Sequence, residues 1–170
     1  MIWPFRRKSR RAMARIAIEG AITGSTRRRV LKALKEAQER EFPALLLRID
    51  SPGGTVGDSQ EIYAALLRLR EKGCHVVASF GNISASGGVY VGVAADKIVS
   101  NPGTITGSIG VILRGNNLSK LLDRVGVKFE TVKSGAFKDI LSPDRALGVE
   151  ERELLQALID SSYEQFVAAV

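Results

Sequence analysis

Two loops rich in serine and glycine each follow a segment that is predicted to be a buried strand. Residues 50–54 (Asp-Ser-Pro-Gly-Gly) follow the apolar run Ala44–Ile49, and residues 82–88 follow the next predicted strand. Ligands bind outside the carboxyl ends of the strands in open parallel sheets. Ser86, which lies directly before two glycines, is therefore a candidate nucleophile for acyl transfer.

The residues around Ser86 could also stabilise the negative charge that acyl transfer creates. Ser86 precedes a predicted helix over 87–95, and the free N–H groups at a helix start favour an anion. Backbone N–H groups of Gly53 and Gly87 could form an oxyanion hole, because glycine lets a substrate carbonyl come close. An ordinary helix cap is an open alternative for Ser86. Phosphate binding has little support, because neither loop matches G-x-x-x-x-G-K-[ST] or G-x-G-x-x-G.

A serine nucleophile needs a base, and the chain contains one histidine, His75. His75 lies at the opposite end of the strand that leads to Ser86, roughly 20 Å away at about 3.3 Å per residue, so it cannot be the base in the same subunit. A carboxylate or a desolvated lysine remains. Lys138 is the candidate, because it lies among apolar residues in 134–141, although a purely structural lysine is an open alternative.

The positioning elements are predicted to alternate between strands and helices, which indicates an α/β fold with parallel β-α-β units. Strands are expected at 14–18, 44–49, 75–80, 98–99, 110–113 and 127–132. Helices are expected at 25–41 with Ser25 as the N-cap, after the loop 50–57 through Ile62, Leu66 and Leu69, at 87–95, at 118–125 and from 149 onward. We expect a basic disordered tail over 1–13 and a single domain over 14–170. The last helical pattern has no stop signal, which suggests that the domain lacks its C-terminal portion.

The net charge of +7 is concentrated in the tail, where residues 6–11 contribute five positive charges, and 7 − 5 leaves +2 elsewhere. Beside Trp3 and Phe5, this cluster could contact an anionic membrane surface, although a solvated tail is the open alternative. No nucleic-acid motif occurs, so no nucleic acid is expected. Cys74, the single cysteine, excludes an intrachain disulfide and is expected to be a small core residue. Without a secretory signal or an apolar membrane span, a cytoplasmic location is predicted, with peripheral contact at the membrane surface as an open alternative.

Five motifs occur in an order that resembles the signal peptide peptidase A (protease IV) family in its short, anchorless single-domain form. They are Asp50-Ser-Pro-Gly-Gly54, Ser84-Ala-Ser-Gly-Gly-Val-Tyr90, Ala94-Ala-Asp-Lys-Ile98, Thr106-Gly-Ser-Ile-Gly-Val111 and Lys133-Ser-Gly-Ala-Phe-Lys-Asp139. The resemblance implies a Clp protease/crotonase-like spiral of β-β-α units with a mainly parallel sheet.

The same resemblance implies roles for individual residues. Ser86 is implied to be the acylating nucleophile and Lys138 the base, with Ser108 orienting the lysine. Gly53 and Gly87 match the oxyanion-hole positions. The substrate-binding residues are expected to be Gly54, Thr55, Val56, Ser84, Ile109 and Gly110.

The family further implies a serine endopeptidase that degrades short apolar peptides such as cleaved signal peptides, which bind as an added strand. It implies a homo-oligomer in which a neighbouring subunit can supply the lysine, and no metal or cofactor. Two alternatives stay open at this point. One is a non-catalytic peptide-binding or membrane-surface scaffold of the same fold, and the other is a crotonase-like enzyme acting on an acyl thioester.

Overall fold

The computed structural model describes residues 12–170, and these residues form two compact units. The first unit contains the described residues up to Gly110 together with Phe166–Val170, and the second is Val111–Gln165. The basic cluster predicted to contact a membrane falls on residues outside the described range. Within residues 12–170, no helix combines the length and the apolar character that a bilayer crossing requires.

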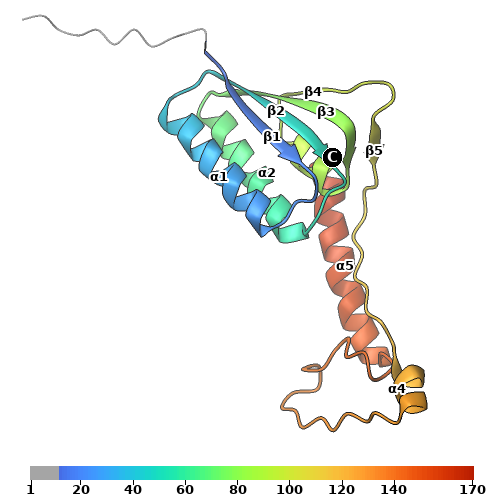
Figure 1. The fold of residues 1–170 in the computed structure, drawn as a ribbon. Coiled ribbons are helices and arrows are strands. Elements are labelled where there is room, and N and C mark those ends of the chain that lie inside the picture. Colours follow the sequence, from blue (N-terminus) through green and yellow to red (C-terminus); the bar gives the residue numbers. More distant parts are fainter. Residues whose placement is uncertain (1–11) are drawn as a thin grey trace, which may run out of the picture. The chain divides into compact units, whose positions relative to one another are not determined.

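A five-stranded sheet forms the centre of the first unit, and all of its strand pairs are parallel (Figure 1). Its strands run in the order β1-β2-β3-β4, and β5 also pairs with β3. The strands are β1 (Ala14–Glu19), β2 (Ala44–Ser51), β3 (His75–Ala85), β4 (Lys97–Val99) and β5 (Ile105–Gly107). The predicted α/β class with a mainly parallel sheet is therefore confirmed.

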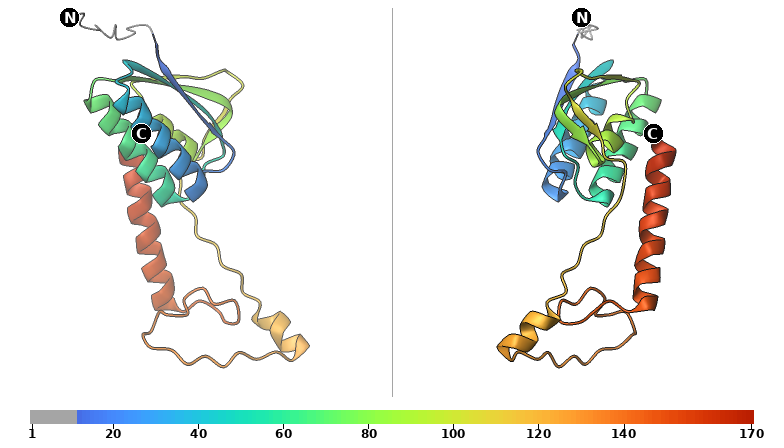
Figure 2. Two further views of the ribbon diagram at one scale, coloured as in Figure 1. Left: turned by 60° about the vertical axis from the view of Figure 1, so that its left-hand side comes forward. Right: turned by 90° about the vertical axis from the view of Figure 1, so that its right-hand side faces the viewer.

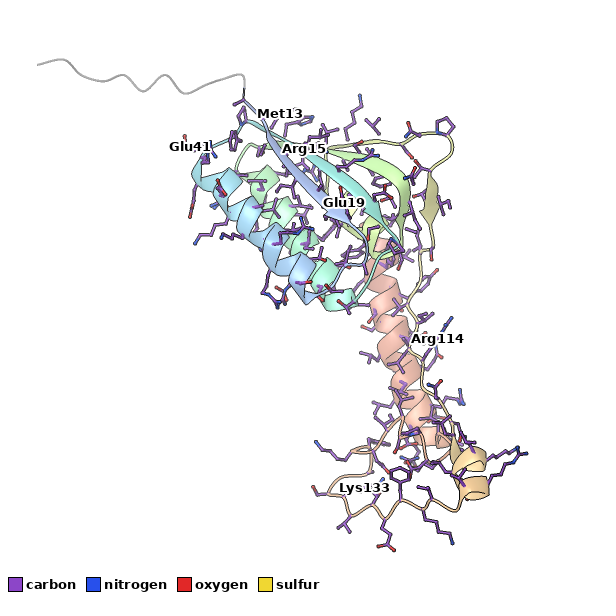
Figure 3. All side chains as sticks on the ribbon, viewed as in Figure 1. Met13, Arg15, Glu19, Glu41, Arg114 and Lys133 are labelled. Atoms are coloured by element: carbon purple, nitrogen blue, oxygen red, sulfur yellow. The ribbon has the colours of Figure 1, made fainter. Side chains whose placement is uncertain are left out.

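Alternating side chains fix which face of the sheet is buried. On β1, Ile16 and Ile18 are buried, while Arg15 before them and Glu19 after them are exposed (Figure 3). The buried positions pair in register with buried positions of β2, because Ile16 lies beside Leu47. A shift of one residue would reverse this pattern, so burial specifies the register.

Helices α1 (Gly24–Glu39) and α2 (Val56–Glu71) pack against each other and against the sheet (Figures 1 and 2). Each helix buries residues at helical spacing, which joins both to one core with β1, β2 and β3. The buried apolar helix residues are Val30, Leu34, Ala37, Ile62, Leu66 and Leu69. The core therefore lies between the sheet and these two helices, and the strand ends that carry the serine and glycine loops are held by it.

The second unit contains α4 (Ser119–Val125) and most of α5 (Val149–Ala169). Helix α4 ends at Gly126, which has the left-handed φ of +73° that is common at a helix C-terminus. A long segment of turns and extended chain connects the two helices. The last residues of α5, from Phe166, belong to the first unit.

Several predicted elements were wrong. No strand forms at 110–113 or 127–132, where Ile112 and Val132 are exposed and the segments have no strand partner among the described residues. Helix α1 begins with Thr23 as its N-cap instead of Ser25, and α3 (Gly87–Gly92) is shorter than the predicted helix. Strand β5 was not predicted, because a three-residue strand has too little pattern to recognise.

Gly54 provides the close contact that connects the first loop to the chain after β1. It forms a β-bridge with Ile22, whose N–H donates to the carbonyl of Gly53 at 2.8 Å. A Cβ at Gly54 would lie 1.9 Å from the carbonyl oxygen of Ile22, whereas a Cβ at Gly57 would meet nothing within 4 Å. The two glycines thus form a matched pair with opposite packing demands.

We expect Gly54→Ala to lower the free energy of unfolding by about 1–3 kcal/mol or more, because backbone atoms must move apart. Gly57→Ala, at the start of α2, should be neutral or stabilising by up to about 1 kcal/mol. Urea denaturation of both variants and the wild type measures these changes. Equal stabilities of the two variants would contradict the bridge as a structural requirement.

Candidate active site

The end of β3 contains a bulge that aims the chain toward Ser86. Strands β2 and β3 pair in register up to Ile49 and Phe80, and then the register shifts so that Ser51 lies opposite Ser84. Residues 81–83 of β3 therefore face a single residue of β2, Asp50. A bulge of this kind bends a strand and changes the direction of the side chains that follow.

The carboxylate of Asp50 fills this bulge. Its Oδ1 accepts from the N–H of Ile83 at 3.1 Å, and its Oδ2 accepts from the side-chain amide of Asn82 at 3.3 Å. Gly81 is required by the close approach, because a Cβ there would lie 2.6 Å from Cγ of Asp50. Asp50 thus supplies the hydrogen bond that the bulged backbone cannot obtain from β2.

Ser86 lies in the sharp turn between β3 and α3, with φ +50° and ψ −121°. A residue with a side chain rarely adopts this conformation, and such strain is typical of functional sites. The N–H of Ser86 donates to the carbonyl of Gly107 at 2.8 Å, and its carbonyl accepts from Tyr90 at 3.0 Å. The half-exposed side chain makes no capping hydrogen bond to α3. An ordinary N-cap has an extended backbone and a bonded side chain, so the helix-cap interpretation is not supported.

This geometry is typical of a serine nucleophile. In α/β hydrolases the nucleophilic serine also lies on a strained strand-to-helix turn, which exposes its hydroxyl. The two predicted oxyanion-hole glycines lie against Ser86. A Cβ at Gly53, which has φ +98°, would be 2.6 Å from the nitrogen of Gly87 and 2.9 Å from Cβ of Ser86.

The two predicted oxyanion donors differ in their hydrogen bonding. The N–H of Gly53 donates to the buried hydroxyl of Ser51 at 3.1 Å, so it already has an acceptor. Gly87 is the first residue of α3, where a backbone N–H has no acceptor within the helix. The nitrogen of Gly54 would be 3.3 Å from a Cβ at Gly87 and also faces this turn. The assignment of Gly53 and Gly87 as oxyanion donors stays a prediction.

Ser108 is brought close to Ser86 through the backbone. It follows Gly107, whose carbonyl accepts the N–H of Ser86, and it has a strained φ of +54°. Ile109 and Gly110, which follow Ser108 in the chain, are exposed. Thr55 and Val56 at the start of α2 are also exposed. These residues are accessible to a ligand, and their predicted contacts with substrate stay predictions.

Ser84 differs from the other predicted substrate-binding residues because its side chain is fully buried. Its carbonyl accepts from the hydroxyl of Thr106 at 2.9 Å, and its own hydroxyl lacks a hydrogen-bond partner within residues 12–170. A contact between Ser84 and a substrate could therefore involve backbone atoms only. Its predicted role is not tested by this arrangement.

Aromatic packing holds α3 behind the turn at Ser86. The ring of Tyr90 lies 4.8 Å from Tyr63 of α2 and 5.2 Å from Phe166, measured between ring centroids. Burial raises the pKa of Tyr90, which keeps the phenol neutral. The hydroxyl of Ser59 also lies close to Gly87, because its oxygen would be 2.5 Å from a Cβ there. Only glycine at position 87 permits this approach.

Lys138 lies in the second unit, on a run of turns over 136–141, and it is exposed. Its N–H donates to the carbonyl of Gly135 at 3.4 Å. The next residue, Asp139, forms ion pairs with Arg145 and with Lys133, which is labelled in Figure 3. The pairing of Lys138 with Ser86 stays a prediction.

The carboxylates near Lys138 are strongly stabilised in their charged form. Hydrogen bonds from Arg145 and then from Lys133 hold the pKa of Asp139 well below its usual range. Hydrogen bonds from Arg145 and from the N–H of Gly148 lower the pKa of Glu151 to about 2. The guanidinium of Arg145, paired with both, has a raised pKa.

His75 and Cys74 lie at the far end of β3 from Ser86. His75 is the first residue of the strand and its Nδ1 lies 3.4 Å from Oδ2 of Asp96. Cys74 is buried as predicted, and burial raises the pKa of its thiol. Within residues 12–170, no group of three or more His, Cys, Asp or Glu residues is placed to hold a metal ion.

Sequence reasoning singled out the loop of Asp50 and Ser51 but gave neither residue a role. It also missed Ser59 and Arg145. The motif identifies the first two as part of the site. The bulge in β3, the buried hydrogen bond from Gly53 to Ser51 and the proximity of Ser59 to Gly87 depend on contacts between different elements. No local sequence pattern could therefore predict them.

Comparison with known proteins identifies a family for the chain. Residues 68–170 match Peptidase family S49. The chain is 64% identical over 170 residues to "Putative protease slr0021" of Synechocystis sp., which covers all of this chain and 61% of that relative. It is 40% identical over 141 residues to "Putative signal peptide peptidase SppA" of Enterococcus faecium, covering 82% of this chain and 41% of that protein. The chain thus spans less than two thirds of the length of either relative.

Solved structures of a "1510-N membrane-bound stomatin-specific protease" have a similar fold. A serine-to-alanine variant of that protein matches with a TM-score of 0.54 at 22% identity, over 62% of this chain and 50% of that chain. A lysine-to-alanine variant in complex with a substrate peptide also has a TM-score of 0.54, at 23% identity, over 62% of this chain and 48% of that chain. At these identities the likeness shows the fold alone.

The contacts of Asp50 predict that Asp50→Ala disturbs the turn at Ser86. Two donors in the bulge lose their acceptor, so we expect a loss of about 1–3 kcal/mol in the free energy of unfolding. We also expect slower covalent labelling of Ser86 by a fluorophosphonate, measured by intact-protein mass. Asp123→Ala, at an exposed position on α4, is the control. Labelling of Asp50→Ala at the wild-type rate would show that the bulge does not position Ser86.

The ion pair between Glu151 and Arg145 predicts that the stability of the fold falls at low pH. The folded pKa of about 2 lies below the ordinary value of 4.5, so the stabilisation is fully present above pH 4.5 and is lost as the pH falls through about 2. We expect the melting temperature of the wild type to fall more steeply over this range than that of Glu151→Gln. Circular dichroism melts measure the slopes, with exposed Glu153→Gln as control. Parallel slopes for wild type and Glu151→Gln would contradict this prediction.

Proposed function

Because the chain belongs to peptidase family S49, we propose that it carries the catalytic centre of a serine endopeptidase with a Ser/Lys dyad. Ser86 is the nucleophile, Lys138 is the general base, and Ser108 orients the lysine. The observation that carries the proposal is the strained, uncapped conformation of Ser86 between two glycine-rich segments. No ordinary structural role for a serine requires this conformation.

In the proposed reaction, Oγ of Ser86 attacks the scissile carbonyl and its proton passes to the uncharged Nζ of Lys138. The carbonyl oxygen becomes an oxyanion, which the N–H of Gly87 stabilises, and the N–H of Gly53 joins it by exchanging its hydrogen bond to Ser51 for one to the oxyanion. Lys138 then donates the proton to the leaving amine. Water, deprotonated by the same lysine, hydrolyses the acyl-enzyme and restores Ser86.

Lys138 must lose contact with water to act as a base, because an ordinary lysine is protonated at neutral pH. The residue is exposed in the single chain. The proposal therefore requires that bound substrate or a neighbouring copy of the chain covers it. Large apolar side chains of the second unit are also exposed, among them Ile112, Leu121 and Phe129, which favours assembly into a homo-oligomer.

The proposed substrates are short apolar peptides, including cleaved signal peptides. Strand β5 pairs with β3 on one side, and among the described strands no other pairs with it. An extended peptide could add to this free edge beside Ser86, with exposed Ile105 and Ile109 contacting its side chains. The name of the Enterococcus faecium relative, a putative signal peptide peptidase, supports this substrate class.

The dyad predicts a specific pattern of covalent labelling. A fluorophosphonate should label the wild-type chain at Ser86, and Ser86→Ala should remove the labelled site. Lys138→Ala should lower the labelling rate by about a hundredfold or more, since general-base catalysis typically contributes 10²–10⁴. Peptide mapping by mass spectrometry locates the label.

Lys120→Ala, at an exposed position on α4, serves as the control and should label like the wild type. Labelling of Lys138→Ala at the wild-type rate would remove this lysine from the mechanism. A well-folded chain that binds an apolar peptide but neither cleaves it nor reacts at Ser86 would instead favour a non-catalytic scaffold.

A further inference from the structure

The segment that carries Lys138 has no regular secondary structure to hold it. Residues 136–141 are turns, and their local hydrogen bonds include a weak one of 3.4 Å from the N–H of Lys138. A catalytic group must be held to within about 0.5 Å of its working position. Contacts outside the backbone of these turns must therefore place the lysine.

Arg145 makes these contacts through the neighbour of Lys138. Its Nε donates to Oδ2 of Asp139 at 3.0 Å, and its Nη2 donates to Oδ1 at 2.9 Å. The same Nη2 lies 3.2 Å from the backbone carbonyl of Asp139. The guanidinium thus hydrogen-bonds both the side chain and the main chain of Asp139, the residue next to the proposed base. A lysine cannot reproduce this geometry.

The other side of the guanidinium is fixed to the start of α5. Nη1 of Arg145 donates to Oε2 of Glu151 at 2.8 Å, and Nη2 donates to Oε1 at 2.5 Å. Glu151 is buried, and its Oε2 accepts from the N–H of Gly148 at 2.7 Å. This contact is half of a capping box, with Glu151 as the third residue of the helix. A continuous chain of charged hydrogen bonds therefore connects Asp139 to a helix end.

We propose that Arg145 is a positioning residue for Lys138, acting through Asp139 and anchored by Glu151. The inference rests on the proposed function, because it assumes that Lys138 is the base. It adds a residue that touches neither substrate nor the reacting atoms.

The pairing also has an electrostatic consequence. An aspartate next to the base could pair with its ammonium and keep it protonated. In the structure the carboxylate of Asp139 is already bound by Arg145 and Lys133. Arg145 thus holds the lysine segment in place and, together with Lys133, engages the charge of the carboxylate next to the lysine in the sequence.

The test measures kcat and kcat/KM for a fluorogenic apolar peptide as a function of pH, on the full chain. Arg145→Met should lower kcat at neutral pH by about tenfold or more, as is typical when a supporting residue is removed. It should also move the rising limb of the pH profile to higher pH, because Asp139, then paired with Lys133 alone, can stabilise the ammonium of Lys138. Arg152→Met, at an exposed arginine of α5, is the matched control and should behave like the wild type.

Two further variants separate positioning from a general loss of structure. Arg145→Met combined with Asp139→Asn should return the rising limb toward its wild-type position, since the freed charge is gone, while kcat stays low. Arg145→Lys keeps the positive charge and should fold, yet it should recover only part of the loss in kcat. Circular dichroism melts report folding for each variant.

A wild-type kcat and pH profile in Arg145→Met would overturn the inference. If that variant does not fold, a wild-type kcat in Arg145→Lys would overturn it equally. Failure of the proposed function looks different, because Lys138→Ala would then retain activity or the wild-type Ser86 would not react. An inactive Lys138→Ala beside a fully active Arg145→Met would sink the positioning role alone.

Discussion

The positive φ of Ser86 is the constraint on which the arrangement of the first unit depends. A residue with a side chain adopts this conformation only where surrounding contacts enforce it. The N–H of Ser86 is held by Gly107 of β5, and its carbonyl accepts from Tyr90 within α3. Gly53 supports the turn from the side, because its lack of a Cβ lets it approach Gly87 and Ser86. Each contact comes from a different segment, so several elements at this end of the sheet together stabilise the strained conformation of Ser86.

The bulge in β3 connects this turn to the hydrophobic core. Up to Phe80 the strand follows the register of β2, and buried side chains fix that register. Beyond Phe80 the register changes, and the carboxylate of Asp50 compensates the backbone that has left the ladder. The sheet therefore ends in an irregular segment that Asp50 stabilises through Ile83 and Asn82, and this segment presents Ser86 in a strained conformation.

The second unit is held together mainly by ion pairs, whereas the first unit is held together mainly by apolar packing. Its apolar side chains are largely exposed, and its turns are organised by Arg145 between Asp139 and Glu151. Charged, bidentate hydrogen bonds give geometric specificity to a segment that buries little apolar surface. The proposed base and the proposed nucleophile thus belong to units that are stabilised by different interactions. Their union in one catalytic centre is the central element of the proposed function.

Local sequence patterns were sufficient to predict the class of the fold, the core strands β1 to β3, the helices α1, α2 and α5, and Ser86 as the candidate nucleophile. These features depend on local periodicity and on motifs, which are properties of neighbouring residues. The tertiary structure alone decided the bulge at Asp50, strand β5, the acceptor for Gly53 and the grip of Arg145 on Asp139. Those features depend on residues far apart in the chain or on hydrogen-bond geometry, and the failed strands at 110–113 and 127–132 show that apolar pattern does not make a strand without a partner.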